Sequence, residues 1–351
     1  MRSLLSVLGA AALLALPAVS PAAADDNAPS SFTIEDERIT ESSGLAASRA
    51  HPGVYWTHND SDDGPYVFAV DGKTGRTVAT VTLRGIGDPR DVEAVSVGPD
   101  GNVYVGDIGD NLGGTWTKVW IYRFPEPERL RDTTVDATQF DVQYQGGPRN
   151  AEAMMVDPRT GRVYIASKSE EDAGLYQGPA TLSASRMNVF RRVSDLDMEV
   201  TDGAFAPDGS RLVLRAYFGV AEYRWGKDGL GEELPEEPSL PIQRQGEAVT
   251  FSPDGGTLLY GTEGAGSRVT AVELEGDLLP DATAKQRDRE DGGGDGGDRR
   301  GGDAAGDRGA DSGDDSLLIG GAVVAVIAVG FWAVRGRRGG RGHRGRRGRR
   351  G

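Results

Sequence analysis

The chain has 351 residues, no cysteine and a formal net charge of -15. The lack of cysteine excludes disulfides, thiol catalysis, cysteine-ligated zinc and a lipoprotein anchor. Nine arginines lie within residues 335–350, so the remaining chain is even more acidic. Because phosphate binding needs clustered lysine and arginine, the acidic part is not expected to bind nucleic acid.

Residues 1–24 have the pattern of a secretory signal peptide. Arg2 supplies one early positive charge, an apolar run covers residues 4–19, and Ala22-Ala23-Ala24 forms an A-x-A cleavage site. Such a segment takes no part in the fold of the mature protein. An uncleaved membrane anchor is the alternative.

Residues 31–277 are predicted to form an all-β fold because one plan recurs five times. Each copy has a short apolar strand, a turn containing Pro or Gly, a second apolar strand and then a polar cluster. Proline presets the first corner of such a turn, and glycine accepts the positive φ that a tight hairpin requires. The first strands of the copies contain Ser43, Glu93, Glu152, Asp202 and Glu247 near their starts. A repeat of about 45–60 residues suits the four-stranded blade of a β-propeller.

The repeat predicts a five-bladed β-propeller, with six blades as the alternative because weak outer strands are easily misassigned. An open β-sandwich is disfavoured by the regularity of the repeat. Outer strands are predicted at Tyr66–Val70, Val78–Leu83, Val119–Phe124, Phe140–Tyr144, Leu175–Gly178, Met187–Val193, Val220–Trp225, Ser239–Gln243 and Arg268–Glu273. The fifth blade then lacks a fourth strand. Phe32–Ile39 is expected to supply it, which would close the ring and leave no open edge.

Several motifs resemble those of secreted bacterial propellers of the NHL, WD-like and esterase-like-phytase kinds. They are Ser43–Ala46, Trp56–Asp60, Asp91–Ala94, Gly106–Asn111, Asn150–Ala153 and Gly246–Ala248. The resemblance covers most of residues 31–277 and implies the propeller fold. Propellers of this group include calcium-dependent lactonases and phosphatases as well as many binding domains, so the fold alone does not choose a function.

The C-terminal part predicts a membrane anchor. Residues 278–316 are rich in Gly, Asp and Arg and are expected to form a disordered linker. Residues 317–334 carry no charge and are long enough to span a membrane as one helix. The basic tail 335–351 then lies in the cytoplasm and the propeller outside the cell, as a single-pass protein of the cell membrane. A sortase signal is disfavoured because Leu279–Thr283 lacks the required LPxTG motif.

A metal site is predicted at one end of the central channel. In a propeller, the innermost strands all begin on the same face, which would bring together Glu93, Glu152, Asp202 and Glu247, with Ser43 completing the ring. Carboxylates gathered in this way repel one another unless they are protonated or share a cation. Oxygen ligands favour calcium. The alternative is that these acids accept hydrogen bonds from backbone amides of neighbouring blades.

Ligand-binding residues are predicted in the polar clusters after the second strands, on the same face. They are His58, Asn59, Asp60, Asp107, Asp110, Asn111, Lys168, Arg215 and Glu263. His58 could act as a base, with a packing or hydrogen-bonding role as the alternative. His51 falls in a turn on the opposite face and is expected to be inert. The catalytic residues, if any, remain unassigned because no G-x-S-x-G or other nucleophile motif is present.

Two functions follow from this pattern. The first is a membrane-anchored ectodomain that binds an extracellular protein, a glycan or a small molecule on its acidic rim. The second is a calcium-dependent extracellular hydrolase acting on an ester, a lactone or a phosphoester, with Glu93, Glu152 or Glu247 as ligand or base.

Overall fold

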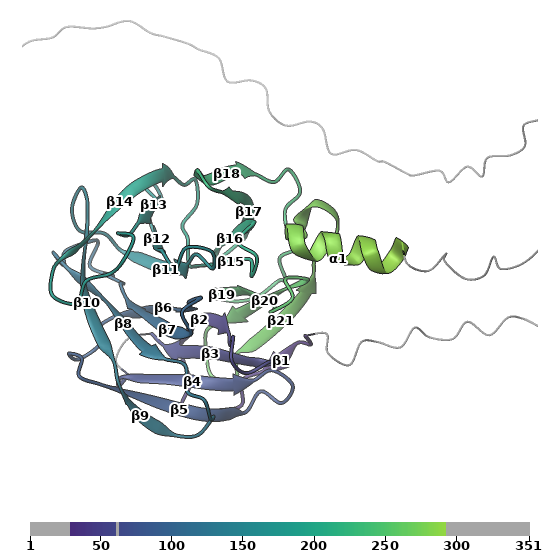
Figure 1. Ribbon diagram of the computed structural model, residues 1–351. Helices are drawn as coiled ribbons and strands as arrows, with labels where there is room; N and C mark the ends of the chain where they lie inside the picture. Colours follow the sequence, from purple (N-terminus) through teal and green to yellow (C-terminus); the bar gives the residue numbers. More distant parts are fainter. Residues whose placement is uncertain (1–28, 61–62, 293–351) are drawn as a thin grey trace, which may run out of the picture. The chain divides into compact units, whose positions relative to one another are not determined.

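The computed structural model describes residues 29–60 and 63–292, which form antiparallel strands around a central axis (Figure 1). Four-stranded antiparallel units, called meanders here, follow one another along the chain. From the axis outward, the first meander has β2 (Ser42–Ala47), β3 (Val54–Asn59), β4 (Tyr66–Asp71) and β5 (Thr77–Arg84), and the second has β6 (Val92–Val97), β7 (Asn102–Asp107), β8 (Val119–Pro125) and β10 (Thr138–Tyr144). The third has β11 (Ala151–Val156), β12 (Val163–Ser167), β13 (Gly174–Gln177) and β14 (Asn188–Asp195), and the fourth has β15 (Asp202–Phe205), β16 (Arg211–Ala216), β17 (Gly219–Gly226) and β18 (Gly229–Glu233). The fifth has β19 (Gly246–Phe251), β20 (Thr257–Thr262), β21 (Arg268–Glu273) and, as its outermost strand, β1 (Phe32–Thr33).

The meanders close into a ring. Their inner strands β2, β6, β11, β15 and β19 contact one another in that order, and β19 contacts β2 again. Each hydrophobic cluster of the core lies between two successive meanders, and the last cluster joins β19–β21 to β2–β4. Apolar side chains are therefore buried on both faces of each meander. The fold is propeller-like.

The N-terminal strand pairs with the last meander, in the position expected for a closing strand. Phe32 lies opposite Val269 in an antiparallel ladder. Only Phe32–Thr33 is strand, whereas the sequence predicts Phe32–Ile39. Beyond it, Ile34 and Ile39 are fully buried in the cluster between the last and the first meander. Burial of these apolar side chains, more than ladder hydrogen bonds, holds this segment in place.

Parallel strand pairs add to the outer edge of two meanders. The strand β9 (Thr133–Asp136) is not among the predicted strands and pairs in parallel with β5. Its Asp136 forms an ion pair with Arg84 of β5 at 2.7 Å. Likewise, β10 pairs in parallel with β14 of the next meander. These pairs cover edges that would otherwise be open.

The predicted outer strand Ser239–Gln243 is wrong. The outermost strand of that meander is β18, which follows β17 directly. Gly229 has a φ of +95°, so the chain can reverse tightly after Gly226. Pro241 lies inside the predicted segment and cannot donate a ladder hydrogen bond.

The predicted disordered linker 278–316 begins too early. The 3₁₀ turn η1 (Gly276–Leu278) and the helix α1 (Asp281–Gly292) follow the last strand. Leu278 and Leu279 are buried between the last two meanders. Arg211 forms an ion pair with Asp281 at 2.9 Å and donates a hydrogen bond to the carbonyl oxygen of Leu279. Apolar burial and this arginine therefore hold the start of α1 against the folded unit.

Several predictions lie outside the described residues. They are the signal peptide 1–24, the membrane helix 317–334, the basic tail 335–351 and the remainder of the linker. Among residues 29–60 and 63–292, no helix has the length and apolar character needed to cross a membrane.

Candidate metal centre

The inner strands carry glutamates at one end of the ring, and a β-bulge lies at each of these glutamates. The pairing of inner and second strand shifts register between Val92 and Ala94, between Ala151 and Ala153, and between Gly246 and Ala248. The residues inside these shifts are Glu93, Glu152 and Glu247. A bulge bends the strand and re-aims the side chain of the extra residue. The same irregularity therefore recurs wherever an inner strand presents a glutamate.

Asp202 differs from the three glutamates. Its strand pairs without a register shift, so Asp202 lies directly opposite Arg215. Its carboxylate is 1% exposed and accepts hydrogen bonds from the backbone amides of Gly203 at 2.7 Å and Val249 at 2.8 Å. Burial raises its pKa, and the amide donors oppose that shift. Asp202 thus joins two meanders. This is the alternative role predicted for the ring of acids, in which they accept hydrogen bonds from backbone amides of neighbouring meanders.

Three carboxylates converge around Glu93. Asp60, Asp91 and Glu93 each offer a carboxylate oxygen within 4.8 Å of the other two. Asp91 and Glu93 are buried, and Asp60 is half-buried. Ser43 Oγ donates a hydrogen bond to Glu93 Oε2 at 3.0 Å, which fixes the glutamate from the neighbouring inner strand. We call Asp60, Asp91 and Glu93 the carboxylate triad.

Burial and neighbouring negative charges favour the protonated forms of Asp91 and Glu93. Burial raises the pKa of Asp91 to about 7, and the hydrogen bond and charge of Asp60 add to this effect. Burial also raises the pKa of Glu93, with further contributions from the charges of Glu152 and Asp60. Protons and divalent cations therefore compete for these oxygens near neutral pH.

The loop after β7 closes over the triad through a glycine. A β-carbon on Gly109 would lie 2.5 Å from Asp91 Oδ2 and 2.8 Å from Glu93 Cγ. The Gly109 amide donates a hydrogen bond to the carbonyl oxygen of Asp91 at 3.1 Å. Only glycine allows the backbone of the Gly106–Asn111 motif to approach the two carboxylates so closely.

Lys168 and Tyr217 link the other two glutamates, Glu152 and Glu247. Lys168 Nζ lies 2.7 Å from Glu152 Oε1 and donates a hydrogen bond to the Tyr217 hydroxyl at 2.7 Å. Burial raises the pKa of Glu152 to about 7, although Lys168 opposes the shift. Burial likewise raises the pKa of Glu247 to about 7, opposed by the charge of Lys168 and by a hydrogen bond with Tyr217. Glutamates with such pKa values can exchange protons at neutral pH.

His58 and Asn59 have internal roles. His58 is fully buried, its Nδ1 lies 2.9 Å from the carbonyl oxygen of Asn59, and burial lowers its pKa. A neutral, enclosed imidazole is poorly placed to serve as a base. Asn59 accepts hydrogen bonds from the amides of Thr40 and Glu41 and donates one to the carbonyl oxygen of Arg38. Asn59 therefore organises the segment before β2.

Asp107, the last residue of β7, and Asp110 in the loop that follows accept hydrogen bonds from nearby backbone amides. Asp107 accepts a hydrogen bond from the Tyr122 hydroxyl at 2.6 Å and from the Asp91 amide at 3.2 Å. Asp110 accepts one from the amide of Trp116. Asn111 is exposed, and its Nδ2 lies 3.5 Å from Asp91 Oδ1. Of the predicted residues in this loop, Asn111 is thus the one beside the triad.

Arg215 lies in β16 and Glu263 follows β20, so each belongs to one of the last two meanders. Arg215 is fully buried and donates hydrogen bonds to the carbonyl oxygens of Ala248 at 2.6 Å and Gly261 at 2.9 Å. Burial lowers its pKa to about 10. Glu263 accepts a hydrogen bond from Gln245, and its pKa is raised by burial and by the charge of Asp60. Arg215 is structural, whereas Glu263 contributes negative charge at the end of the ring that carries the glutamates. We call the opening of the ring at this end the mouth.

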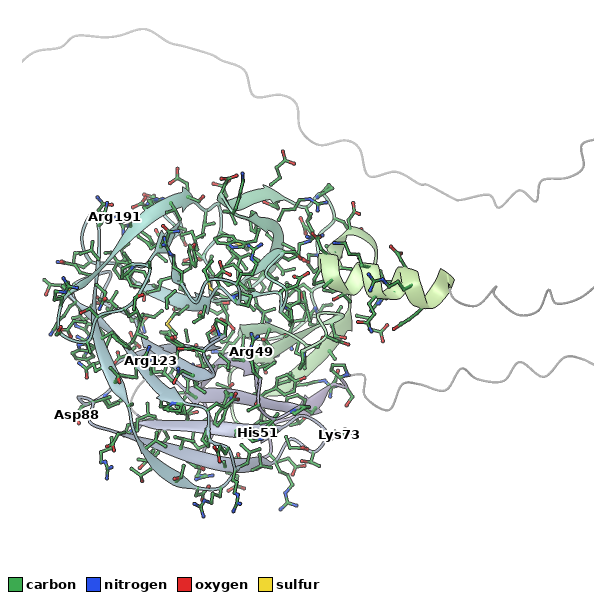
Figure 2. All side chains as sticks on the ribbon, viewed as in Figure 1. Arg49, His51, Lys73, Asp88, Arg123 and Arg191 are labelled. Atoms are coloured by element: carbon green, nitrogen blue, oxygen red, sulfur yellow. The ribbon has the colours of Figure 1, made fainter. Side chains whose placement is uncertain are left out.

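The opposite end of the ring has a different character. A cavity of about 240 Å³ lies there, lined by apolar residues such as Phe205 and Phe251 together with Arg49, which is labelled in Figure 2. No carboxylate is among its lining residues. His51, also labelled in Figure 2, lies 2.7 Å from the carbonyl oxygen of Pro127 through its Nε2. The carboxylates of the inner strands therefore lie at the other end of the ring, which we call the glutamate end.

Two residues of this end were missed by sequence reasoning. Asp91 precedes Glu93 by two positions, so strand alternation could have placed both on one side. Tyr217 lies in the tight turn between β16 and β17, beside exposed Phe218, and no pattern in the sequence links it to Lys168.

Comparison with known proteins gives distant structural matches. No family model matches the chain, and a search of curated proteins finds no match. A gluconolactonase from Xanthomonas campestris is 15% identical over 69% of this chain and 78% of its own, with a TM-score of 0.44. Putative 6-phosphogluconolactonases from Bacteroides uniformis and Bacteroides fragilis are 15% and 13% identical over 68% of both chains, with TM-scores of 0.38 and 0.39. Likeness at this level does not reveal the chemistry, which depends on the residues themselves.

Proposed function

We propose that the protein is a five-bladed propeller whose carboxylate triad binds calcium and that this cation serves the hydrolysis of an ester or lactone. The observation that carries the proposal is the convergence of Asp60, Asp91 and Glu93 within 4.8 Å. Calcium lies about 2.4 Å from its oxygen ligands, so one ion can contact oxygens up to about 4.8 Å apart. The residues therefore fit the ion.

The donor set also favours calcium over softer metals. The three side chains offer only carboxylate oxygens, which suit hard cations. A bound cation would polarise a carbonyl group and lower the pKa of a nearby water. Glu152 and Glu247 have pKa values of about 7, so each can accept or return a proton at neutral pH. These properties support hydrolysis.

A ligand-binding ectodomain without turnover is the second candidate. Carboxylates gather at the glutamate end. Arg215 of strand β16 is fully buried, so its positive charge is not presented to a ligand there. A negative mouth of this kind attracts a cationic segment of an extracellular protein. In either case, we propose that residues 317–334 hold the folded unit outside the cell membrane.

The experiment measures calcium binding by calorimetry and thermal stability in calcium or EDTA, followed by turnover of an ester and lactone panel. We expect Asp91→Asn and Glu93→Gln each to weaken calcium binding by at least about tenfold. The control is Glu128→Gln, which removes an exposed carboxylate far from the triad. A wild-type protein that neither binds calcium nor changes its melting temperature would reject the calcium site, and calcium binding without turnover would favour the second candidate.

A further inference from the structure

Lys168 occupies a distinctive position at the glutamate end. Its Nζ is held between Glu152 Oε1 and the Tyr217 hydroxyl, each at 2.7 Å. A lysine ammonium has three N–H donors, and these contacts use two of them. Burial lowers the pKa of Lys168, but the charge and hydrogen bond of Glu152 more than offset that effect, so its pKa is raised. Lys168 thus remains a cation with one donor available to a ligand.

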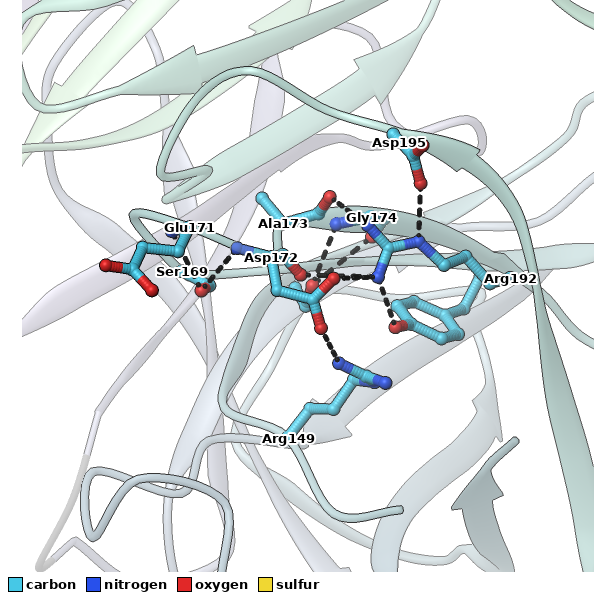
Figure 3. A network of polar contacts seen from close by, with 10 residues as sticks. Arg149, Ser169, Glu171, Asp172, Ala173, Gly174, Arg192 and Asp195 are labelled. Atoms are coloured by element: carbon cyan, nitrogen blue, oxygen red, sulfur yellow. Dashed lines mark hydrogen bonds and ion pairs between the residues drawn. The ribbon is translucent and has the colours of Figure 1, made fainter. Parts of the chain in front are cut away.

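The residues that follow Lys168 in the chain belong to a network of polar contacts (Figure 3). Asp172 forms ion pairs with Arg149 and Arg192, and Arg192 also pairs with Asp195 at 2.8 Å. Ser169 Oγ accepts hydrogen bonds from the Glu171 and Asp172 amides (Figure 3). The Lys168 amide itself donates to the carbonyl oxygen of Asn150 at 3.0 Å. The backbone that aims Lys168 is therefore fixed before any ligand arrives, which favours a role in positioning charge.

The Lys168 side chain is partly accessible to solvent. It is 16% exposed, whereas its partner Glu152 is 5% exposed. Lys168 also lines a cavity of about 210 Å³, together with Gly113, Asn150 and Ser169. This cavity offers space for a small substrate beside Lys168.

We propose that Lys168 donates a hydrogen bond to the carbonyl oxygen of a neutral ester or lactone and stabilises the oxyanion formed during hydrolysis. This inference rests on the proposed function. The charge of Lys168 lowers the pKa values of Glu247 and Glu263. An anionic substrate such as a phosphate monoester would meet these carboxylates and is disfavoured.

Hydrolysis adds water to the acyl carbon and then expels the alkoxy group. A water oxygen forms a bond to the acyl carbon and gives a proton to a carboxylate at the mouth, while the π electrons move to the carbonyl oxygen facing Lys168. When this electron pair returns, the bond between the acyl carbon and the alkoxy oxygen breaks. The leaving oxygen takes the proton back from the carboxylate. One ester and one water thus give one acid and one alcohol.

Tyr217 is a positioning residue in this scheme. Its hydroxyl accepts a hydrogen bond from Lys168, and it also interacts with Glu247 through a hydrogen bond that lowers the glutamate pKa. Tyr217 therefore restrains the ammonium between residues of three successive meanders. Tyr217→Phe is expected to lower kcat less than removal of the lysine charge.

The experiment compares Lys168→Met, Lys168→Arg and Glu171→Gln in the purified full chain. Steady-state turnover of a neutral ester, calcium affinity by calorimetry and melting temperature are measured for each. We expect Lys168→Met to lower kcat by about 100-fold, as for loss of an oxyanion donor, with little change in KM. Lys168→Arg should restore part of kcat, and Glu171→Gln, whose side chain is exposed, should match wild type.

Lys168→Met alone leaves Glu152 buried without its partner, so the double variant Lys168→Met with Glu152→Gln is compared with Glu152→Gln alone. We expect both to fold and bind calcium, and we expect the double variant to have the lower kcat. Unchanged kcat in a folded, calcium-binding Lys168 variant overturns the inference while the proposed function stands. Faster turnover of a phosphate monoester than of its neutral analogue also overturns it. Absence of calcium binding or turnover in wild type instead removes the proposed function on which the inference rests.

Discussion

The Asp202 carboxylate accepts a hydrogen bond from the Val249 amide at 2.8 Å and thereby joins β15 to β19. The glutamates at equivalent positions lie within β-bulges, and Glu93 accepts its hydrogen bond from the Ser43 hydroxyl of the neighbouring inner strand and not from a backbone amide. Residues that share a place in the repeat therefore differ in role. The bulge separates a structural acid from those available to a cation or substrate.

Replacement of Asp202 should affect stability and leave calcium binding unchanged. We expect Asp202→Ala to lower the free energy of unfolding by about 1–3 kcal/mol, because the buried amides of Gly203 and Val249 lose their acceptor. Chemical denaturation and calorimetry check the two effects. Weakened calcium binding at full stability would show that Asp202 belongs to the metal site after all.

Calcium binding should weaken as the pH falls below about 7. The pKa of Asp91 is raised to about 7, so in acid a proton occupies the site that the cation needs. Binding near neutral pH should therefore release protons, which calorimetry in buffers of different ionisation enthalpy can count. A calcium affinity that is constant from pH 6 to pH 8 would contradict this assignment.

Glu222 should make the fold less stable as the pH rises. Neither of its buried carboxylate oxygens has a hydrogen-bond partner among the described residues, and Arg211 Nε lies 3.9 Å away. Burial raises its pKa from 4.5 to about 8, opposed by Arg211. Between these values the folded state holds a proton that the unfolded state has lost, so stability falls with pH through this window.

Glu222→Gln should remove that dependence. We compare the free energy of unfolding of the variant with that of wild type at each pH. This difference is expected to shift in favour of the variant by on the order of 2–5 kcal/mol from pH 5 to pH 9. Urea denaturation at both pH values measures the difference. Glu232→Gln, at an exposed position on the adjacent strand β18, is the control and should follow wild type.

Leu279 should stabilise the folded unit although it lies within the predicted linker. It is 7% exposed and belongs to the cluster between the last two meanders. Leu279→Ala is expected to cost about 2–5 kcal/mol, as for other buried leucines. Thermal and chemical denaturation test this, with Lys285→Ala at an exposed position of α1 as the control. Equal stability of the two variants would instead support the boundary predicted from the sequence, with the linker starting at residue 278.

The repeat itself could be read from the sequence because its signals are local. Apolar strands alternate with turns such as Pro99-Asp100-Gly101, where Gly101 has a φ of +72°. Local patterns also place Glu93, Glu152 and Glu247 near the start of inner strands. The boundary at Leu279 was missed because the apolar partners of this residue lie far away in the chain.

The recurrence of strand, turn and strand and the identity of the acids are evident from the sequence alone. Which of these acids meet depends on the folded structure. Side-chain direction depends on hydrogen-bond register between strands, and the register shifts at Glu93 but not at Asp202. The approach of Asp60 to Asp91, and of Lys168 to Tyr217, depends on packing between successive meanders. Such contacts join residues distant in sequence, so no local pattern records them.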